Sequence, residues 1–295
     1  MALSEEGHEI VGVVTQPDRP AGRGRKMSPS PVRVVAGEEG FGVLTPEKPR
    51  GEEFLQALRA LEPELSVVVA YGHILNREVL DLPSEGSVNL HASLLPALRG
   101  AAPIHWAILR GHSVTGVTVM RMVEEMDAGP IILQTQEKIG PEETTTELST
   151  RLSQVGAQAL VEALALLEEG AAEEVEQDHS RATFAPKVSR DMARVDWNRP
   201  ATELDWHVRG LDAVPGAWSL LNGDPVKLFR SRAEPHFTHG EPTGTVLEFT
   251  PDTGLLVACG SGALAIREIH PPGKRRMPVS AWIQGQPVRA GDRFE

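Results

Sequence analysis

Short apolar runs alternate with amphipathic segments through the first half of the chain, which is typical of a parallel sheet covered by helices. The pattern predicts strands at 10–14, 65–70, 87–91, 117–122 and 131–138, and helices at 31–39, 52–61, 103–110 and 145–169. The run at 65–70 is apolar on both faces, so we expect a deeply buried central strand there. The fold class predicted is α/β, with a Rossmann-like, doubly wound, mostly parallel sheet.

The pattern changes after Gly170, where short apolar runs are separated by many glycines and prolines. We expect a helix at 201–211 and a small OB-like β-barrel with strands at 218–221, 225–230, 244–249, 255–258 and 263–269. The predicted domains are therefore a first domain at 1–185, a linker at 186–199 and a barrel domain at 200–295.

The 295 residues suffice for two domains that fold without oligomerising, so we expect a monomer. No apolar run approaches the roughly 20 residues that span a bilayer, and no membrane role is predicted. The single Cys259 excludes an internal disulfide, and the first residues carry neither a basic flank nor an apolar targeting core. These features favour a cytoplasmic location.

The net charge of -12 at first argues against a nucleic-acid partner. Residues 1–200 hold 19 basic and 30 acidic side chains, and the remainder holds 10 and 11. Within the acidic part, the segment 18–33 reverses the balance, because five cations accompany the single Asp18: Arg19, Arg23, Arg25, Lys26 and Arg33. A local basic surface is therefore compatible with the acidic total.

Two polar side chains share one face of the predicted strand 87–91, because residues two apart in a strand point the same way. These are Asn89 and His91, and the turn at 93–96 puts them near the carboxyl end of the strand, where open α/β sheets hold ligands. Asp127 lies in a polar loop between two predicted strands, which we expect at the same edge of the sheet. An amide, an imidazole and a carboxylate are thus predicted to converge.

This trio suits acyl transfer to an amine through a tetrahedral intermediate. The Asn89 amide can donate to the oxygen that becomes negative, and a protonated His91 can add a second donor. The Asp127 carboxylate, directly or through water, can accept the proton that the attacking amine sheds. No covalent enzyme intermediate is needed.

Other interpretations of single residues remain open at this point. An isolated Asn, His or Asp in such places is more often a hydrogen-bonding or turn residue than a catalyst. Ser93 lacks the Gly-x-Ser-x-Gly elbow of a serine hydrolase. His105 and His112 lack the His-Glu-x-x-His pattern, and no metal site is predicted.

Four segments together resemble the folate-dependent formyltransferase superfamily: 89–96 (NLHASLLP), 99–104 (RGAAPI), 116–120 (GVTVM) and 126–129 (MDAG). The resemblance implies that Asn89, His91 and Asp127 are catalytic and that 10-formyltetrahydrofolate is the formyl-donating co-substrate. It also implies a pterin cleft lined by Val69, Tyr71, Gly72, Ile74, Leu75, Ser93, Leu94, Leu95, Pro96, Val123 and Met126.

Two further features resemble the branch of that superfamily that formylates methionyl initiator tRNA. The loop at 15–27 resembles the loop that meets the acceptor stem, with Arg23 at its key arginine position, although a solvated basic loop is the alternative. The carboxyl-terminal half resembles that branch's OB-type barrel, which holds the tRNA backbone. The tRNA-binding cations implied are Arg19, Arg23, Arg25, Lys26, Lys187, Arg190, Lys227, Arg230, Lys274, Arg275 and Arg276, of which 274–276 could equally form an ordinary solvated turn.

The resemblance begins late, because family members usually open with an apolar strand, a Gly-Thr-Pro turn and half a helix. About 20 such residues have no counterpart before His8, and in a doubly wound sheet that first strand is central. If the chain is shortened, we therefore expect a gap in the sheet and low stability. A misplaced start or a shortened chain explains the missing segment better than a natural variant does.

Two alternatives to the tRNA substrate stay open. One is a formyltransferase or formyl-hydrolase of a small metabolite, which needs neither the Arg23 loop nor the barrel. The other is a tRNA-binding protein with a silent catalytic half, against which the retained Asn89, His91 and Asp127 argue.

Overall fold

The computed structural model describes residues 1–21, 24, 26–285 and 288–295 and divides into two compact units. Unit 1 comprises Met1–Arg99, Val117–Thr135 and Gln154–Thr183. Unit 2 comprises Gly100–Gly116, Gln136–Ser153 and Phe184–Glu295. Three long elements contribute residues to both units: β7 (Val114–Arg121), β8 (Ile131–Lys138) and α6 (Thr145–Glu168).

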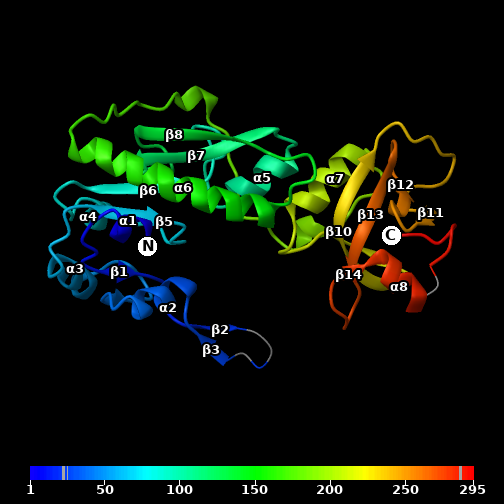
Figure 1. The fold of residues 1–295 in the computed structure, drawn as a ribbon, viewed down its shortest axis with the longest axis horizontal. Coiled ribbons are helices and arrows are strands. Elements are labelled where there is room, and N and C mark those ends of the chain that lie inside the picture. Colours follow the sequence, from blue (N-terminus) through cyan, green and yellow to red (C-terminus); the bar gives the residue numbers. More distant parts are fainter. Residues whose placement is uncertain (22–23, 25, 286–287) are drawn as a thin grey trace. The chain divides into compact units, whose positions relative to one another are not determined.

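Unit 1 is a mixed α/β structure (Figure 1). Its helices are α1 (Ala2–Glu5), α2 (Pro31–Glu38), α3 (Glu52–Arg59), α4 (Arg77–Leu80) and the 3-10 helix η1 (His179–Arg181). Its remaining strands are β1 (Val13–Val14), β2 (Arg19–Ala21), β3 (Lys26–Ser28), β4 (Val43–Leu44), β5 (Ser66–Val69) and β6 (Ser87–His91).

The predicted α/β class and parallel strand pairing are present, but the strands of unit 1 form three sheets rather than one mostly parallel, doubly wound sheet. The main sheet has the order β5-β6-β7-β8, with β5 parallel to β6 but β6 antiparallel to β7. A separate parallel pair joins β1 to β4, and β2 and β3 form an antiparallel hairpin. The chain passes from β6 through α5 into β7, and β7 pairs with β6 in the opposite direction.

The predicted deep burial of the strand at 65–70 was also wrong. All of β5 is partly exposed, and Val69 keeps 51% of its surface accessible. The reason is that β5 pairs with β6 on one edge while no described strand pairs with its other edge. The parallel β1–β4 pair and the main sheet are separate sheets, because no described strand joins β1 or β4 to β5.

Helix ends in the structure follow the local sequence. Ser30 accepts a hydrogen bond from the Arg33 backbone N–H and Pro31 begins α2, a combination favoured at helix starts. At the start of α6, the Glu147 carboxylate accepts from the Thr144 N–H and hydroxyl. Gly170 follows the end of α6 with a φ of 65°, a left-handed conformation that glycine adopts without strain.

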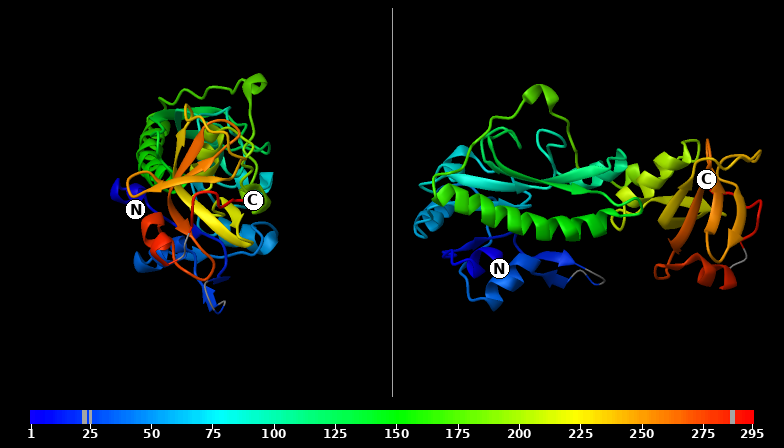
Figure 2. Two further views of the ribbon diagram at one scale, coloured as in Figure 1. Left: turned by 90° about the vertical axis from the view of Figure 1, so that its right-hand side faces the viewer. Right: turned by 45° about the horizontal axis from the view of Figure 1, so that its top comes forward.

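Unit 2 is built around an antiparallel sheet, for which Figure 2 gives two further views. The sheet has the order β11-β12-β13-β10-β9, and β14 pairs with β13. Its strands are β9 (Trp218–Leu221), β10 (Asp224–Glu234), β11 (Val246–Thr250), β12 (Gly254–Ala258), β13 (Ala263–His270) and β14 (Met277–Pro278). Its helical segments are α5 (Pro103–Leu109), η2 (Asp191–Ala193), α7 (Ala201–Gly210) and α8 (Val279–Gly285).

The expected closed barrel is not found among the described residues. The end strands β9 and β11 do not pair with each other; instead Leu221 and Thr245 form single bridges to Phe294 and Arg293. One continuous core joins α7, α8 and the sheet, with Leu204, Leu228 and Ile266 completely buried. In the described part of the chain, no helix combines the length and apolar character needed to cross a membrane.

Candidate active site

Strand β6 carries the first two candidate residues. Val88 is completely buried and Asn89 is half-buried, and side chains two positions apart in a strand point to the same face. Asn89 and His91 therefore share one face of the main sheet.

Two contacts fix the His91 ring, which is only 6% exposed. Its Nε2 lies 3.0 Å from the Leu98 carbonyl oxygen, and because a carbonyl only accepts, Nε2 carries a hydrogen and donates it. The other ring nitrogen, Nδ1, lies 3.7 Å from Oδ2 of Asp127. The imidazole thus presents one defined nitrogen to the carboxylate.

The loop that carries Asp127 starts at the end of β6 that lies away from His91. Strand β7 pairs Thr118 with His91 but Arg121 with Val88, so the loop after Arg121 leaves at the amino end of β6. The expectation that this loop starts at the same sheet edge as His91 was therefore wrong. Because Asp127 nevertheless lies beside His91, the loop folds back over the face of β6.

Two buried residues with no role predicted from the sequence hold this loop. Gln177 Nε2 donates to the backbone carbonyls of Asp127 and Gly129, at 2.9 and 2.8 Å. Gln177 Oε1 accepts from Nε and Nη2 of Arg99, at 3.2 and 2.7 Å. Arg99 stands in one of the motifs quoted above, but Gln177 lies 50 positions beyond Asp127, and no sequence signal links them.

The turn after β6 is held by its own hydrogen bonds. Ser93 Oγ donates to the Ala97 carbonyl at 2.6 Å, so this hydroxyl is engaged within the turn. Thr118 Oγ1 donates to the Ser93 carbonyl at 2.6 Å and accepts from the Leu95 N–H at 3.2 Å. Of the predicted folate contacts here, Leu95 is buried, whereas Leu94 and Pro96 remain partly exposed.

The other predicted folate contacts lie on two segments of unit 1. Val69, Ile74, Val123 and Met126 are large apolar side chains that stay exposed. Leu75 instead packs against the core cluster around α3 and α4. Gly72 has a φ of 80°, and a Cβ there would lie 2.8 Å from Gln16 Nε2, which donates to the Tyr71 carbonyl. The backbone after β5 is thus close to another segment of unit 1.

The Tyr71 side chain differs from these residues in its polar hydroxyl group. Its hydroxyl is buried without a hydrogen-bond partner in the described residues, and burial raises the pKa of Tyr71 above its usual value. The neighbouring His73 ring lies 5.3 Å away between centroids, and its Nε2 is likewise buried without a described partner. Two polar atoms beside the main sheet thus have unused hydrogen-bonding capacity.

No cluster of three or more His, Cys, Asp or Glu side chains suited to a metal ion occurs in the described part of the chain. Cys259 is buried in unit 2, and this burial raises its thiol pKa to about 12. The thiol is therefore neutral at physiological pH and a poor nucleophile.

The predicted tRNA-binding cations fall into two groups. Arg19 and Lys26 are exposed on the β2–β3 hairpin, and Lys187, Arg190, Lys274 and Arg275 are exposed in unit 2. Arg23 and Arg25 lie outside the described residues. The exposed side chains are placed where an anionic partner could reach them.

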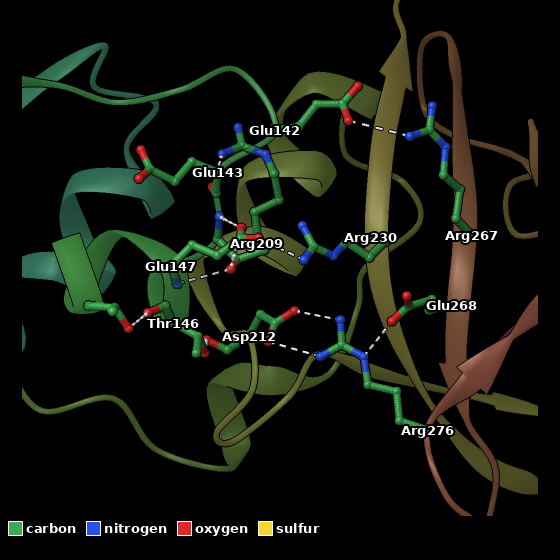
Figure 3. Close-up of polar contacts among 12 residues, drawn as sticks. Glu142, Glu143, Thr146, Glu147, Arg209, Asp212, Arg230, Arg267, Glu268 and Arg276 are labelled. Carbon is green, nitrogen blue, oxygen red and sulfur yellow. Dashed lines mark hydrogen bonds and ion pairs between the residues drawn. The ribbon is translucent and has the colours of Figure 1, made fainter.

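The second group makes contacts within unit 2, and Figure 3 shows those of Arg230 and Arg276. Arg276 pairs with Asp212 at 3.0 Å and Glu268 at 2.6 Å, and its guanidinium lies 4.0 Å from the Phe229 ring centroid. Arg230 pairs with Glu147 at 2.7 Å, and Lys227 Nζ donates to the Pro215 carbonyl at 2.6 Å. These cations already have intramolecular partners.

Two family models place this chain in the formyltransferase class of enzymes. Residues 1–164 match the family described as "Formyl transferase", and residues 187–287 match "Formyl transferase, C-terminal domain". The chain belongs to the formyl transferase family.

The similar proteins carry a more specific name. A methionyl-tRNA formyltransferase of Moorella thermoacetica is 46% identical over 291 residues, covering 99% of this chain and 93% of its own. One of Aromatoleum aromaticum is 46% identical over 294 residues, covering 100% and 92%.

Solved structures share the fold at low identity. The Helicobacter canadensis N-formyltransferase, solved with folinic acid and dTDP-3-aminofucose, has a TM-score of 0.66 at 15% identity, covering 94% of this chain and 93% of its own. HypX of Aquifex aeolicus with tetrahydrofolic acid has a TM-score of 0.64 at 19% identity, covering 96% of this chain and 50% of its own.

Proposed function

We propose that this enzyme transfers the formyl group of 10-formyltetrahydrofolate to the amino group of methionyl initiator tRNA, for translation initiation. The observation that carries the proposal is the 3.7 Å separation of His91 Nδ1 and Asp127 Oδ2, on the sheet face that also carries Asn89. The shared name of the relatives supports the acceptor.

The amino nitrogen would attack the formyl carbon, and the carbonyl π electrons would move onto the formyl oxygen. The Asn89 amide would donate to that oxygen, and His91 would add positive charge when protonated. Asp127, directly or through water, would accept the proton released by the amine. The bond from the formyl carbon to N10 of the folate then breaks, and N10 takes up a proton.

Exposed apolar side chains support a flat heteroaromatic donor. Val69 and Ile74 flank the loop after β5, and Val123 and Met126 belong to the loop that carries Asp127. Pockets for such rings are mostly apolar with a few placed polar groups, and Tyr71 and His73 offer buried polar atoms that lack described partners. Two solved relatives of this fold contain folates.

The tRNA would be held mainly by its phosphates. We propose residues 1–185 as the catalytic domain, 186–199 as a linker and 200–295 as an OB-like tRNA-binding domain. Exposed Lys187, Arg190, Lys274 and Arg275 would meet the backbone, and the 15–27 loop would meet the acceptor stem. A monomeric, cytoplasmic enzyme that uses no metal fits this role.

The decisive experiment measures transfer of labelled formyl from 10-formyltetrahydrofolate to methionyl initiator tRNA. We expect turnover with this acceptor and at least 100-fold less with methionyl elongator tRNA or a dTDP-amino sugar. His91→Ala should lower the rate by about 100-fold, whereas His236→Ala, at an exposed position in unit 2, should not. Equal or faster turnover of the amino sugar would favour a small-metabolite enzyme.

A further inference from the structure

We infer that Gln177, held in place by Arg99, is a positioning residue that sets the location of the Asp127 carboxylate. The inference rests on the proposed function, because Asp127 matters only if it receives a proton. It concerns two side chains of unit 1 that do not contact the reacting atoms.

The Asp127 loop needs an external support. It leaves β7 beside the amino end of β6 and must turn back to bring Asp127 to His91, which lies at the other end of that strand. Asp127 itself has a φ of 52°, a left-handed conformation that costs free energy for a residue other than glycine. Such a conformation persists only when neighbouring groups fix the backbone.

Gln177 supplies that support through a single amide nitrogen. Its Nε2 donates to the carbonyls of Asp127 and Gly129, on both sides of Ala128. The two acceptors define where the backbone of the loop passes. Because Gln177 is 4% exposed, water cannot readily replace these bonds, and losing them would leave two carbonyls without their donor.

Arg99 decides how the Gln177 amide is oriented. Its guanidinium can only donate, so the two Arg99 bonds require the oxygen of Gln177 on that side and the nitrogen on the loop side. Arg99 is itself 3% exposed and also lies 3.6 Å from Glu125, in the same loop. The pair therefore forms a rigid connection from the buried side of the site to the Asp127 backbone.

A side-chain amide carries both an acceptor for Arg99 and a donor for the loop, whereas a carboxylate carries acceptors only. Gln177→Glu keeps the shape and the bonds to Arg99 but has no donor for the two carbonyls. We expect a 10- to 100-fold fall in kcat, since misplacing a catalytic group by about 1 Å costs about that much. The equilibrium Kd for tetrahydrofolate should stay within threefold of the wild-type value. Gln154→Glu, which adds the same charge at an exposed position of α6, is the matched control.

A double-variant cycle separates positioning from general damage. In the Asp127→Asn background no carboxylate remains to be placed, so Gln177→Glu should lower kcat by less than threefold. A purely structural role would give the same loss in both backgrounds and would overturn the inference. If Gln177→Glu does not fold, Gln177→Met removes the same donor without introducing a buried charge.

Hydrogen exchange tests the inference without turnover. Amides of the segment 123–131 should exchange at least tenfold faster in Gln177→Glu than in Gln154→Glu, because the loop loses its support. Unchanged exchange, or unchanged kcat in an active enzyme, contradicts the role of Gln177. A wild-type protein that transfers no formyl group to methionyl initiator tRNA contradicts the proposed function instead, and the exchange result still decides the role of Gln177.

Discussion

His91 Nδ1 lies 3.7 Å from Asp127 Oδ2, while the Nε2 of the same ring donates to the Leu98 carbonyl. The ring is therefore held between a backbone acceptor and a carboxylate, and it cannot turn over without losing the Leu98 bond. This arrangement places an imidazole and a carboxylate, a potential proton acceptor, at one point on the face of β6.

Asn89→Ala should slow formyl transfer without preventing folate binding. Removing one donor to a developing oxyanion costs about 100- to 1,000-fold in kcat, because the negative charge exists only during the reaction. Steady-state kinetics with methionyl initiator tRNA measures this, with the tetrahydrofolate Kd expected within threefold of wild type. Asn222→Gly, in an exposed turn of unit 2 with a φ of 53°, serves as the control. An unchanged kcat for Asn89→Ala would remove the amide from the mechanism.

Gly129→Ala should displace the Asp127 loop. An added Cβ would overlap the Arg121 carbonyl oxygen, so the backbone must move. We expect a loss of about 1–3 kcal/mol in the free energy of unfolding and at least a tenfold fall in kcat. Gly37→Ala, where a Cβ in α2 would contact nothing within 4 Å, should raise stability by about 0.5–1 kcal/mol. Urea titrations and rate measurements compare the two, and a fully active Gly129→Ala enzyme would show that the loop tolerates the displacement.

Replacing cations of unit 2 with alanine should have two different effects, one on tRNA binding and one on stability. Lys187→Ala and Arg190→Ala should weaken tRNA binding and reduce the slope of log K against log salt by about 0.7–0.9 for each lost phosphate contact. Arg276→Ala should instead lower the free energy of unfolding by about 3 kcal/mol, because Asp212 is buried and would lose its partner. Binding titrations at several salt concentrations and urea unfolding distinguish the two effects. A salt slope altered only by Arg276→Ala would reverse the assignment.

Stability should fall as the pH drops below about 6.5, partly because of His207. Burial, with a smaller contribution from Arg199, lowers the pKa of His207 to about 4 in the folded protein. His207 in the unfolded chain takes up a proton near pH 6.5. The contribution of neutral His207 to the free energy of unfolding is therefore complete above that pH and is lost as the pH falls toward 4. The expected contribution is about 2 kcal/mol less stability at pH 5 than at pH 7.

His207→Leu tests this pH dependence, since leucine has no proton to gain. The difference between the unfolding free energies at pH 7 and pH 5 should shrink by about 2 kcal/mol relative to wild type. His236→Ala, at an exposed position, should leave that difference unchanged. An identical pH dependence in wild type and His207→Leu would mean that His207 is protonated equally in both states.

Local patterns predicted the individual elements well. Strands β6, β8 and β9 have the predicted bounds, and α6 begins at the predicted Thr145, because alternation and capping depend on neighbours in sequence. The elements α1, β2, β3, β4, α4, β14 and α8 were not predicted. All of them except the seven-residue α8 have two to four residues, which give too little periodicity. The exposure of β5 was not predictable from its own residues, because burial depends on which strand lies on its other side.

By itself the sequence determined the residue types of the site and which of them share a strand face, because side-chain alternation is a local property of an extended backbone. It also carried the motifs that place the chain in its family. Only the tertiary structure decided that the Asp127 loop folds back over β6, that Gln177 and Arg99 hold it, and that Arg276 is paired within unit 2. Those contacts join residues far apart in the chain, and their partners are fixed by packing rather than by spacing.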